Sequence, residues 1–200
     1  MSRARTARVE RATKETRIRC AVDLDGTGAA RVDTGIGFLD HMLTAFATHA
    51  RLDLELECAG DLHVDDHHTA EDCALTLGQA LDEALGDRRG IARFGDALVP
   101  LDEALVRCAL DLSGRPSSVV TLEFARERLG GLATENVTHF FQSLAVALRM
   151  TLHLDRLRAR NDHHQAEAAF KACARALRAA VALDPLPDGA AAVPSTKGVL

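Results

Sequence analysis

An internal repeat constrains the fold of this 200-residue chain more than any other feature. The segment His67-His68-Thr69-Ala70-Glu71 returns as His163-His164-Gln165-Ala166-Glu167. Residues 18–24 return in the same way as residues 106–112, and each of these segments runs into a glycine. A lone histidine, His41 or His139, precedes each histidine pair at a similar distance. We therefore expect two copies of one folding unit, each built around the same side chains.

The spacing of apolar residues predicts the elements of each copy. Residues 18–24 alternate between apolar and polar, which is typical of a half-buried strand, and residues 52–58 and 150–154 follow the same pattern. Helical spacing appears in residues 38–50, 66–85, 137–149 and 162–183. Asp66 and Asp162 stand directly before the histidine pairs, so we expect their side chains to cap the helices that begin there.

These elements predict an α+β fold of two tandem βββαβα repeats, in residues 1–92 and 93–184. Each repeat would form a four-stranded sheet with two helices on one face. Because the helices need a second apolar surface, the repeats should pack helix to helix as a sheet–helix–helix–sheet sandwich. Residues 185–200 are rich in proline and alanine and are expected to form a C-terminal tail outside the repeat.

Composition excludes several classes of protein. The chain is 47% hydrophobic, which suits a sizeable core, and its net charge of -5 comes without the basic face that nucleic acids require. It contains no apolar run long enough to span a membrane and no signal peptide after its arginine-rich start, so we expect a cytoplasmic protein. The five cysteines form no C-x-x-C pair and are expected to be reduced core residues.

The histidine pairs predict metal binding. At a helix start, His67 and Glu71 share one face, whereas His68 is turned away by about 100°. The two histidines of a pair should therefore serve different ions, with further ligands from the other half or from another subunit. Six histidines and two glutamates would supply three His and one Glu to each of two ions: His41, His67, His68, Glu71, His139, His163, His164 and Glu167. Four protein ligands leave room for substrate on a six-coordinate ion.

Two alternatives remain at this point. In the first, the histidine pairs are only polar residues at helix starts, and His41 and His139 are hydrogen-bonded core histidines. The presence of two matching clusters favours metal binding over this explanation. The ion is also open, since zinc has the higher affinity for most such sites, whereas glutamate ligands and six-coordination favour manganese.

Several longer motifs identify the chain as similar to a known family. They are residues 11–16 (RATKET), 33–42 (DTGIGFLDHM), 65–72 (DDHHTAED), 90–95 (GIARFG), 113–116 (SGRP), 160–164 (RNDHH) and 194–198 (PSTKG). Together they resemble the imidazoleglycerol-phosphate dehydratase family of histidine biosynthesis, over nearly the whole chain. The resemblance implies two Mn²⁺ per subunit held by the eight ligands above. It also implies a homo-oligomer, expected as a 24-mer, with active sites at subunit interfaces.

The resemblance also implies the reaction. D-erythro-imidazole glycerol phosphate, a small phosphorylated imidazole, would lose water to give imidazole acetol phosphate through a metal-bound imidazolate. Glu15 would carry the proton, and the ligands His67, His68, Glu71, His163, His164 and Glu167 would share in catalysis. Substrate would contact Glu15, His41, His67 and His163. Its phosphate would bind cations and hydroxyls of loops, the tail and one helix: Arg93, Arg115, Lys171, Ser195 and Lys197.

Two other functions explain part of the pattern. A metal-storage assembly accounts for the clustered ligands but leaves the phosphate-suited residues without a role. A dinuclear metallohydrolase accounts for both, although such sites are usually richer in bridging aspartates. With imidazole glycerol phosphate, a dehydratase would give a ketone, a hydrolase free phosphate, and a storage protein neither.

Overall fold

The structure is a computed structural model that describes residues 4–184 and 191–198. In the first half, the elements follow one another as β1 (Thr6–Ala12), β2 (Thr16–Asp23), β3 (Ala30–Asp33), α1 (Gly37–Ala50), β4 (Asp53–Gly60) and α2 (His67–Leu85). This is the predicted βββαβα order.

The second half repeats the order with one addition. Its elements are β5 (Phe94–Leu101), β6 (Ala104–Asp111), β7 (Ser117–Thr121), α3 (Thr134–Ala147), β10 (Thr151–Arg158) and α4 (Asp162–Val181). A short hairpin, β8 (Arg128–Leu129) and β9 (Leu132–Ala133), is inserted between β7 and α3. The alternation within single strands gave no sign of this hairpin.

The two sheets have the same topology. Their strand orders are β1-β2-β4-β3 and β5-β6-β10-β7, and in each sheet the last pair of the order is parallel while the others are antiparallel. Even the register is repeated, since Cys20 lies opposite Leu56 and Cys108 lies opposite Leu154. The duplication seen in the sequence is therefore a duplication of the fold.

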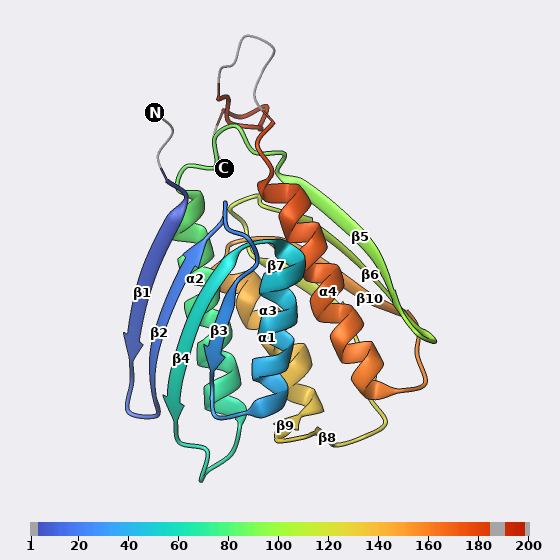
Figure 1. Cartoon of the computed structure of the whole chain (residues 1–200). Coiled ribbons are helices and arrows are strands. Elements are labelled where there is room, and N and C mark those ends of the chain that lie inside the picture. Colours follow the sequence, from blue (N-terminus) through green and yellow to red (C-terminus); the bar gives the residue numbers. More distant parts are fainter. Residues whose placement is uncertain (1–3, 185–190, 199–200) are drawn as a thin grey trace.

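The helices form the middle of the molecule. α2 packs against α3 and α1 packs against α4, so each helix contacts a helix of the other half, with one sheet on either side (Figure 1). The predicted sheet–helix–helix–sheet sandwich is confirmed. Its core includes Phe140 and Phe141 of α3 and Phe170 of α4, whose ring centroids lie within 5.8 Å of one another. Burial of the apolar helix faces where α2 meets α3 and α1 meets α4 drives the two halves together.

All four helices begin at the same end of the molecule, the lower end in Figure 1. Both histidine pairs lie in the first turn of a helix, so the fold brings the two repeated motifs to one end. The tail residues 191–198 lie at the opposite end (Figure 1).

The predicted helix caps were wrong in detail. The backbone N–H of His67 donates to Asp65, and Asn161 accepts from the N–H groups of His163 and His164. Asp66 and Asp162 instead bind the connection that leads into α3. Asp66 accepts from the N–H of Ala133, and Asp162 accepts from the N–H groups of Ala125 and Arg126. These two aspartates therefore bind a segment distant in sequence and do not cap their own helices.

The cysteines and the helices bear on two expectations drawn from composition. All five cysteines are free thiols, and four of them are buried. Among the described residues, no helix has the length and apolar character needed to cross a membrane.

Candidate functional site

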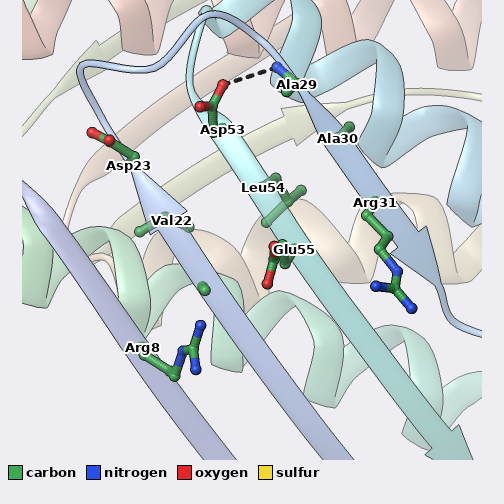
Figure 2. A pocket seen from close by; sticks show the side chains of 10 residues that line it. Arg8, Val22, Asp23, Ala29, Ala30, Arg31, Asp53, Leu54 and Glu55 are labelled. Atoms are coloured by element: carbon green, nitrogen blue, oxygen red, sulfur yellow. Dashed lines mark hydrogen bonds between the residues drawn. The ribbon is translucent and has the colours of Figure 1, made fainter.

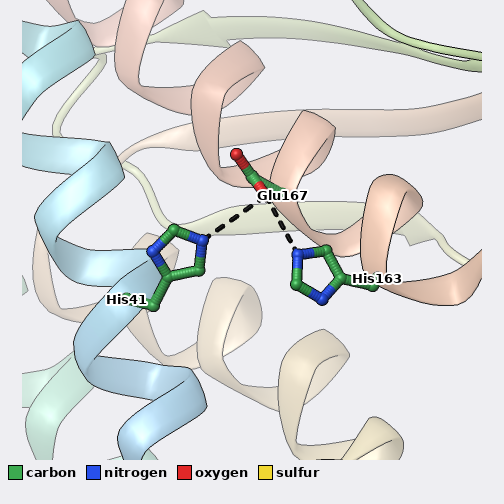
Figure 3. Close-up of side chains that lie close together, drawn as sticks. All are labelled: His41, His163 and Glu167. Carbon is green, nitrogen blue, oxygen red and sulfur yellow. Dashed lines mark hydrogen bonds and ion pairs between the residues drawn. The ribbon is translucent and has the colours of Figure 1, made fainter.

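One cluster joins α1 of the first half to α4 of the second half. His41 projects from α1 towards His163 and Glu167 of α4 (Figure 3). The Oε2 atom of Glu167 lies 3.1 Å from His163 Nε2 and 3.5 Å from His41 Nε2. The three donor atoms lie within 4.8 Å of one another, close enough for a single ion to bind all three.

A second cluster repeats the first with the halves exchanged. His67 and Glu71 come from α2, and His139 comes from α3. His139 Nε2 lies 2.9 Å from Glu71 Oε1, and the rings of His67 and His139 stack at 4.7 Å. The Nδ1 atom of His67 is hydrogen-bonded to Asn136 Oδ1 at 3.0 Å, which directs Nε2 towards the cluster. Each cluster therefore needs both halves of the chain.

The donor sets fit a divalent transition metal. Two imidazole nitrogens and one carboxylate oxygen suit zinc, manganese and related ions, and three protein ligands leave positions for others. Burial raises the pKa of Glu167, but the Lys171 ammonium, 2.6 Å from Oε1, and the neighbouring His163 outweigh it and hold the pKa below its ordinary value. The carboxylate is therefore ionised at neutral pH, as a metal ligand must be.

Two of the eight predicted ligands lie outside both clusters. His68 Nδ1 is 3.0 Å from Asp61, and its Nε2 is 3.7 Å from Glu15. His164 is held in the same way, with Nδ1 2.9 Å from Glu103. The hydrogen bond to Asp61 raises the pKa of His68, and the one to Glu103 raises that of His164. Each imidazole is thus fixed through Nδ1, with Nε2 directed away from its carboxylate.

Asp61, Glu103 and Asn136 are site residues that sequence reasoning missed. Glu103 also accepts from the backbone N–H groups of Arg160 and Asn161, at 3.2 and 2.7 Å. The hydrogen bond with His164, aided by these amides, lowers the pKa of Glu103 to about 2. The predicted histidine ligands themselves indicated that such residues exist, because a ligating histidine usually donates its other ring N–H to a carboxylate or carbonyl oxygen. Glu103 also occupies the hairpin turn that corresponds to the turn of Glu15.

The predicted phosphate-binding residues lie in two places. Lys171 lies beside Glu167 at the metal clusters. Arg93, by contrast, is hydrogen-bonded through its backbone to Ala180, thirteen residues beyond Glu167 on α4, which is about 20 Å along the helix. The others at that end are Arg115, in the turn after β6, and Ser195 and Lys197 in the tail. A single chain does not bring these four residues to its own clusters.

A hollow of 360 Å³ lies elsewhere, on the outer face of the first sheet (Figure 2). Arg8, Glu55 and Arg31 are among its lining residues, and Figure 2 shows them on three strands of the sheet, β1, β4 and β3. No residue of the predicted site lines it. Charges of both signs alternate across this face, as on an ordinary solvated sheet surface.

The sequence is similar to known proteins along most of its length. The family model for imidazoleglycerol-phosphate dehydratase matches residues 34–177. The imidazoleglycerol-phosphate dehydratase of Phytophthora nicotianae is 60% identical over 100% of this chain, which spans 43% of that longer protein. That of Cereibacter sphaeroides is 55% identical, over 98% of this chain and 100% of its own length.

Two solved structures share the fold. The imidazoleglycerol-phosphate dehydratase of Staphylococcus aureus has a TM-score of 0.81 and 36% identity, covering 89% of this chain and 99% of its own. That of Pyrococcus furiosus, in complex with (S)-C348, has a TM-score of 0.82 and 38% identity, covering 96% of this chain and 100% of its own. By its sequence and its fold together, this chain belongs to the imidazoleglycerol-phosphate dehydratase family.

Proposed function

We propose that this chain catalyses the metal-dependent dehydration of D-erythro-imidazole glycerol phosphate to imidazole acetol phosphate. The relatives are named for this dehydratase, a hydro-lyase of histidine biosynthesis. One observation carries the proposal for this chain. In a member of that family, each half contributes to two clusters that combine two imidazoles with one carboxylate.

The proposed cofactor is Mn²⁺, two ions per subunit. His41, His163 and Glu167 would hold one ion, and His67, Glu71 and His139 would hold the other. When bound, such ions would withdraw electron density from the substrate imidazole and so favour loss of its N–H proton and of the adjacent hydroxyl.

The remaining ligands support a site shared between subunits. His68 and His164 lie outside the clusters of their own chain, although a carboxylate holds each in a fixed orientation. Arg93 lies about 20 Å along α4 from Glu167. Neighbouring copies would therefore supply the fourth ligand of each ion and most phosphate donors. This makes the protein a homo-oligomer, proposed as a 24-mer with active sites at subunit interfaces.

Glu15 is suited to move the proton. Its backbone N–H donates to Thr13 Oγ1 at 3.1 Å, which fixes the β1–β2 turn, while its side chain is half exposed. Its Oε1 lies 3.7 Å from His68 Nε2, so Glu15 would reach the same substrate as His68. The carboxylate would take the C–H proton at Oε1 and later return a proton to the product.

The substrate phosphate needs fixed positive charge. Lys171 provides an ammonium beside Glu167, and Arg93, Arg115, Ser195 and Lys197 belong to segments at the opposite end of the molecule. Guanidinium and ammonium groups bind phosphate oxygens through charge-assisted hydrogen bonds. These residues would orient the substrate so that its diol faces Glu15.

The test uses the intact protein, stripped with a chelator and reloaded with manganese. Reloaded protein should bind about two ions per chain and convert imidazole glycerol phosphate to an enolisable ketone, and stripped protein should lose turnover and partly dissociate. Free phosphate as the product would indicate a hydrolase, and metal binding with neither product would indicate storage. Full activity in stripped protein would exclude the metal from the reaction.

A further inference from the structure

The segment between the two halves holds the C-terminal tail. Arg93, the last residue before β5, has a φ of 71°, a left-handed conformation that is unfavourable for a residue with a side chain. Its backbone N–H donates to Ala180 of α4 at 2.8 Å, and its carbonyl accepts from Leu112 at 3.0 Å. The strained backbone of Arg93 is thus fixed by elements on both sides.

Asp111, at the end of β6, fixes the side chain of Arg93. The two carboxylate oxygens of Asp111 accept from Nε and Nη2 of Arg93, at 2.7 and 3.0 Å. The guanidinium also lies 4.7 Å from the centre of the Phe94 ring. Both charged side chains are largely buried, at 13% and 19% exposed. This planar two-point contact leaves the guanidinium little freedom to rotate.

The third nitrogen of Arg93 binds the tail. Nη1 donates to the carbonyl of Pro194 at 2.7 Å, and the N–H of Gly90 donates to Ala192 at 2.8 Å. Directly after Pro194, the tail turns, with Ser195 accepting from the backbone N–H groups of Lys197 and Gly198. Arg93 therefore holds the tail next to the two tail residues proposed to bind phosphate.

The first half contains a similar pair, although its acidic residue, Asp25, stands two positions beyond Asp23, which is the residue that corresponds to Asp111. Arg5 precedes β1 as Arg93 precedes β5, its carbonyl accepts from Leu24, and its guanidinium contacts both oxygens of Asp25. There, Nη1 donates to the carbonyl of Val181, at the end of α4. Each copy thus has an Arg–Asp pair next to its first strand, and among the described residues only the pair of the second copy binds the tail.

We infer that Asp111 is a positioning residue that orients Arg93, so that Arg93, Ser195 and Lys197 form one preformed phosphate-binding group. The inference rests on the proposed function, because the phosphate belongs to the proposed substrate. Three of the five guanidinium N–H groups are used by Asp111 and Pro194, and the other two, one on each Nη, have no hydrogen-bond partner among the described residues. These two groups are the ones available to a phosphate.

The experiment compares Asp111→Asn with Asp155→Asn in the full-length, metal-loaded protein. Asp155 is a matched control, since it also pairs with an arginine, Arg107, on the outer face of the same sheet, at 2.9 Å. Hydrogen–deuterium exchange of residues 191–198 is measured without substrate. We expect exchange roughly tenfold faster in Asp111→Asn and unchanged exchange in Asp155→Asn.

Steady-state kinetics provide the second readout. Asp111→Asn should raise KM for imidazole glycerol phosphate about tenfold, weaken inhibition by inorganic phosphate to a similar degree, and leave kcat within about twofold. Asp111→Glu, which keeps the carboxylate, should recover part of both effects. A loss of kcat at unchanged KM would contradict a role in phosphate binding.

The outcomes separate this inference from the proposed function. Tail exchange that is unchanged in Asp111→Asn, or equally fast in Asp155→Asn, overturns the positioning role whatever the kinetics show. A wild-type protein that leaves imidazole glycerol phosphate unchanged overturns the function, while the exchange measurement still decides whether Asp111 orders the tail.

Discussion

The Nε2 atom of His139 lies 2.9 Å from the Oε1 atom of Glu71, joining a helix of the second half to a helix of the first. His41 and Glu167 make the reciprocal contact at 3.5 Å. Neither half contains a complete cluster, because the lone histidine and the histidine–glutamate pair always come from different halves. Metal binding is therefore expected to depend on the packing of the two repeats against each other.

Replacing one lone histidine should empty one cluster. In His139→Ala the cluster retains two donors, His67 and Glu71, so the protein should lose about one of its two bound ions per chain. Elemental analysis after gel filtration measures this directly. His153→Ala is the control, because His153 lies exposed on β10 away from both clusters, and its metal content should match the wild type. Equal metal content in both variants would remove His139 from the site.

Removing the proton carrier should separate binding from rate. Glu15→Gln keeps the size of the side chain and the backbone hydrogen bond to Thr13, so KM should change little. Turnover should fall by about 10²-fold or more, since the amide accepts no proton. A suitable control is Glu10→Gln on neighbouring β1, whose carboxylate pairs weakly with Arg19 at 3.6 Å. If Glu15→Gln turns over at the wild-type rate, another group moves the proton.

A tail residue that binds phosphate should affect KM. Lys197→Ala removes one ammonium from the tail, so KM should rise about tenfold and inhibition by inorganic phosphate should weaken, with kcat nearly unchanged. Arg89→Ala removes an exposed cation paired with Asp87 and serves as the control for charge alone. Equal KM values for the two variants would leave the tail without a role in substrate binding.

Asp53 should stabilise the fold in a pH-dependent way. Backbone hydrogen bonds from Thr27 and Ala29 lower its pKa below the ordinary 3.8, so the folded state binds this proton more weakly than the unfolded chain. The stabilisation that ionised Asp53 gives to the folded state is complete well above pH 3.8. It is lost as the pH falls past 3.8 and through the lowered pKa of the folded state. The difference in urea midpoint between wild type and Asp53→Asn should therefore be constant from pH 8 to about pH 5 and shrink under stronger acid. A difference that grows on acidification contradicts this.

Local patterns in the sequence were sufficient to predict the element order and the internal duplication. Strand and helix periodicities are local, and the apolar faces they define must be buried, so residues 18–24 and 106–112 indicated strands in both halves and the helices indicated the sandwich. The repeated histidine–glutamate spacing also depends only on the helical rise, which places His67 and Glu71 on one face.

The tertiary structure decided which side chains meet. His41 joins the His163 cluster and His139 joins the His67 cluster because α1 packs on α4 and α2 on α3, and no local pattern encodes that pairing. Contacts with distant segments also outweighed local preferences, since Asp66 binds the connection before α3 instead of capping its own helix. The contacts of Arg93 also depend on tertiary structure. Asp111 reaches Arg93 because the end of β6 lies beside the start of β5, and Arg93 in turn binds the tail at Pro194. Local periodicity specifies faces, whereas the burial of those faces against one another specifies the site.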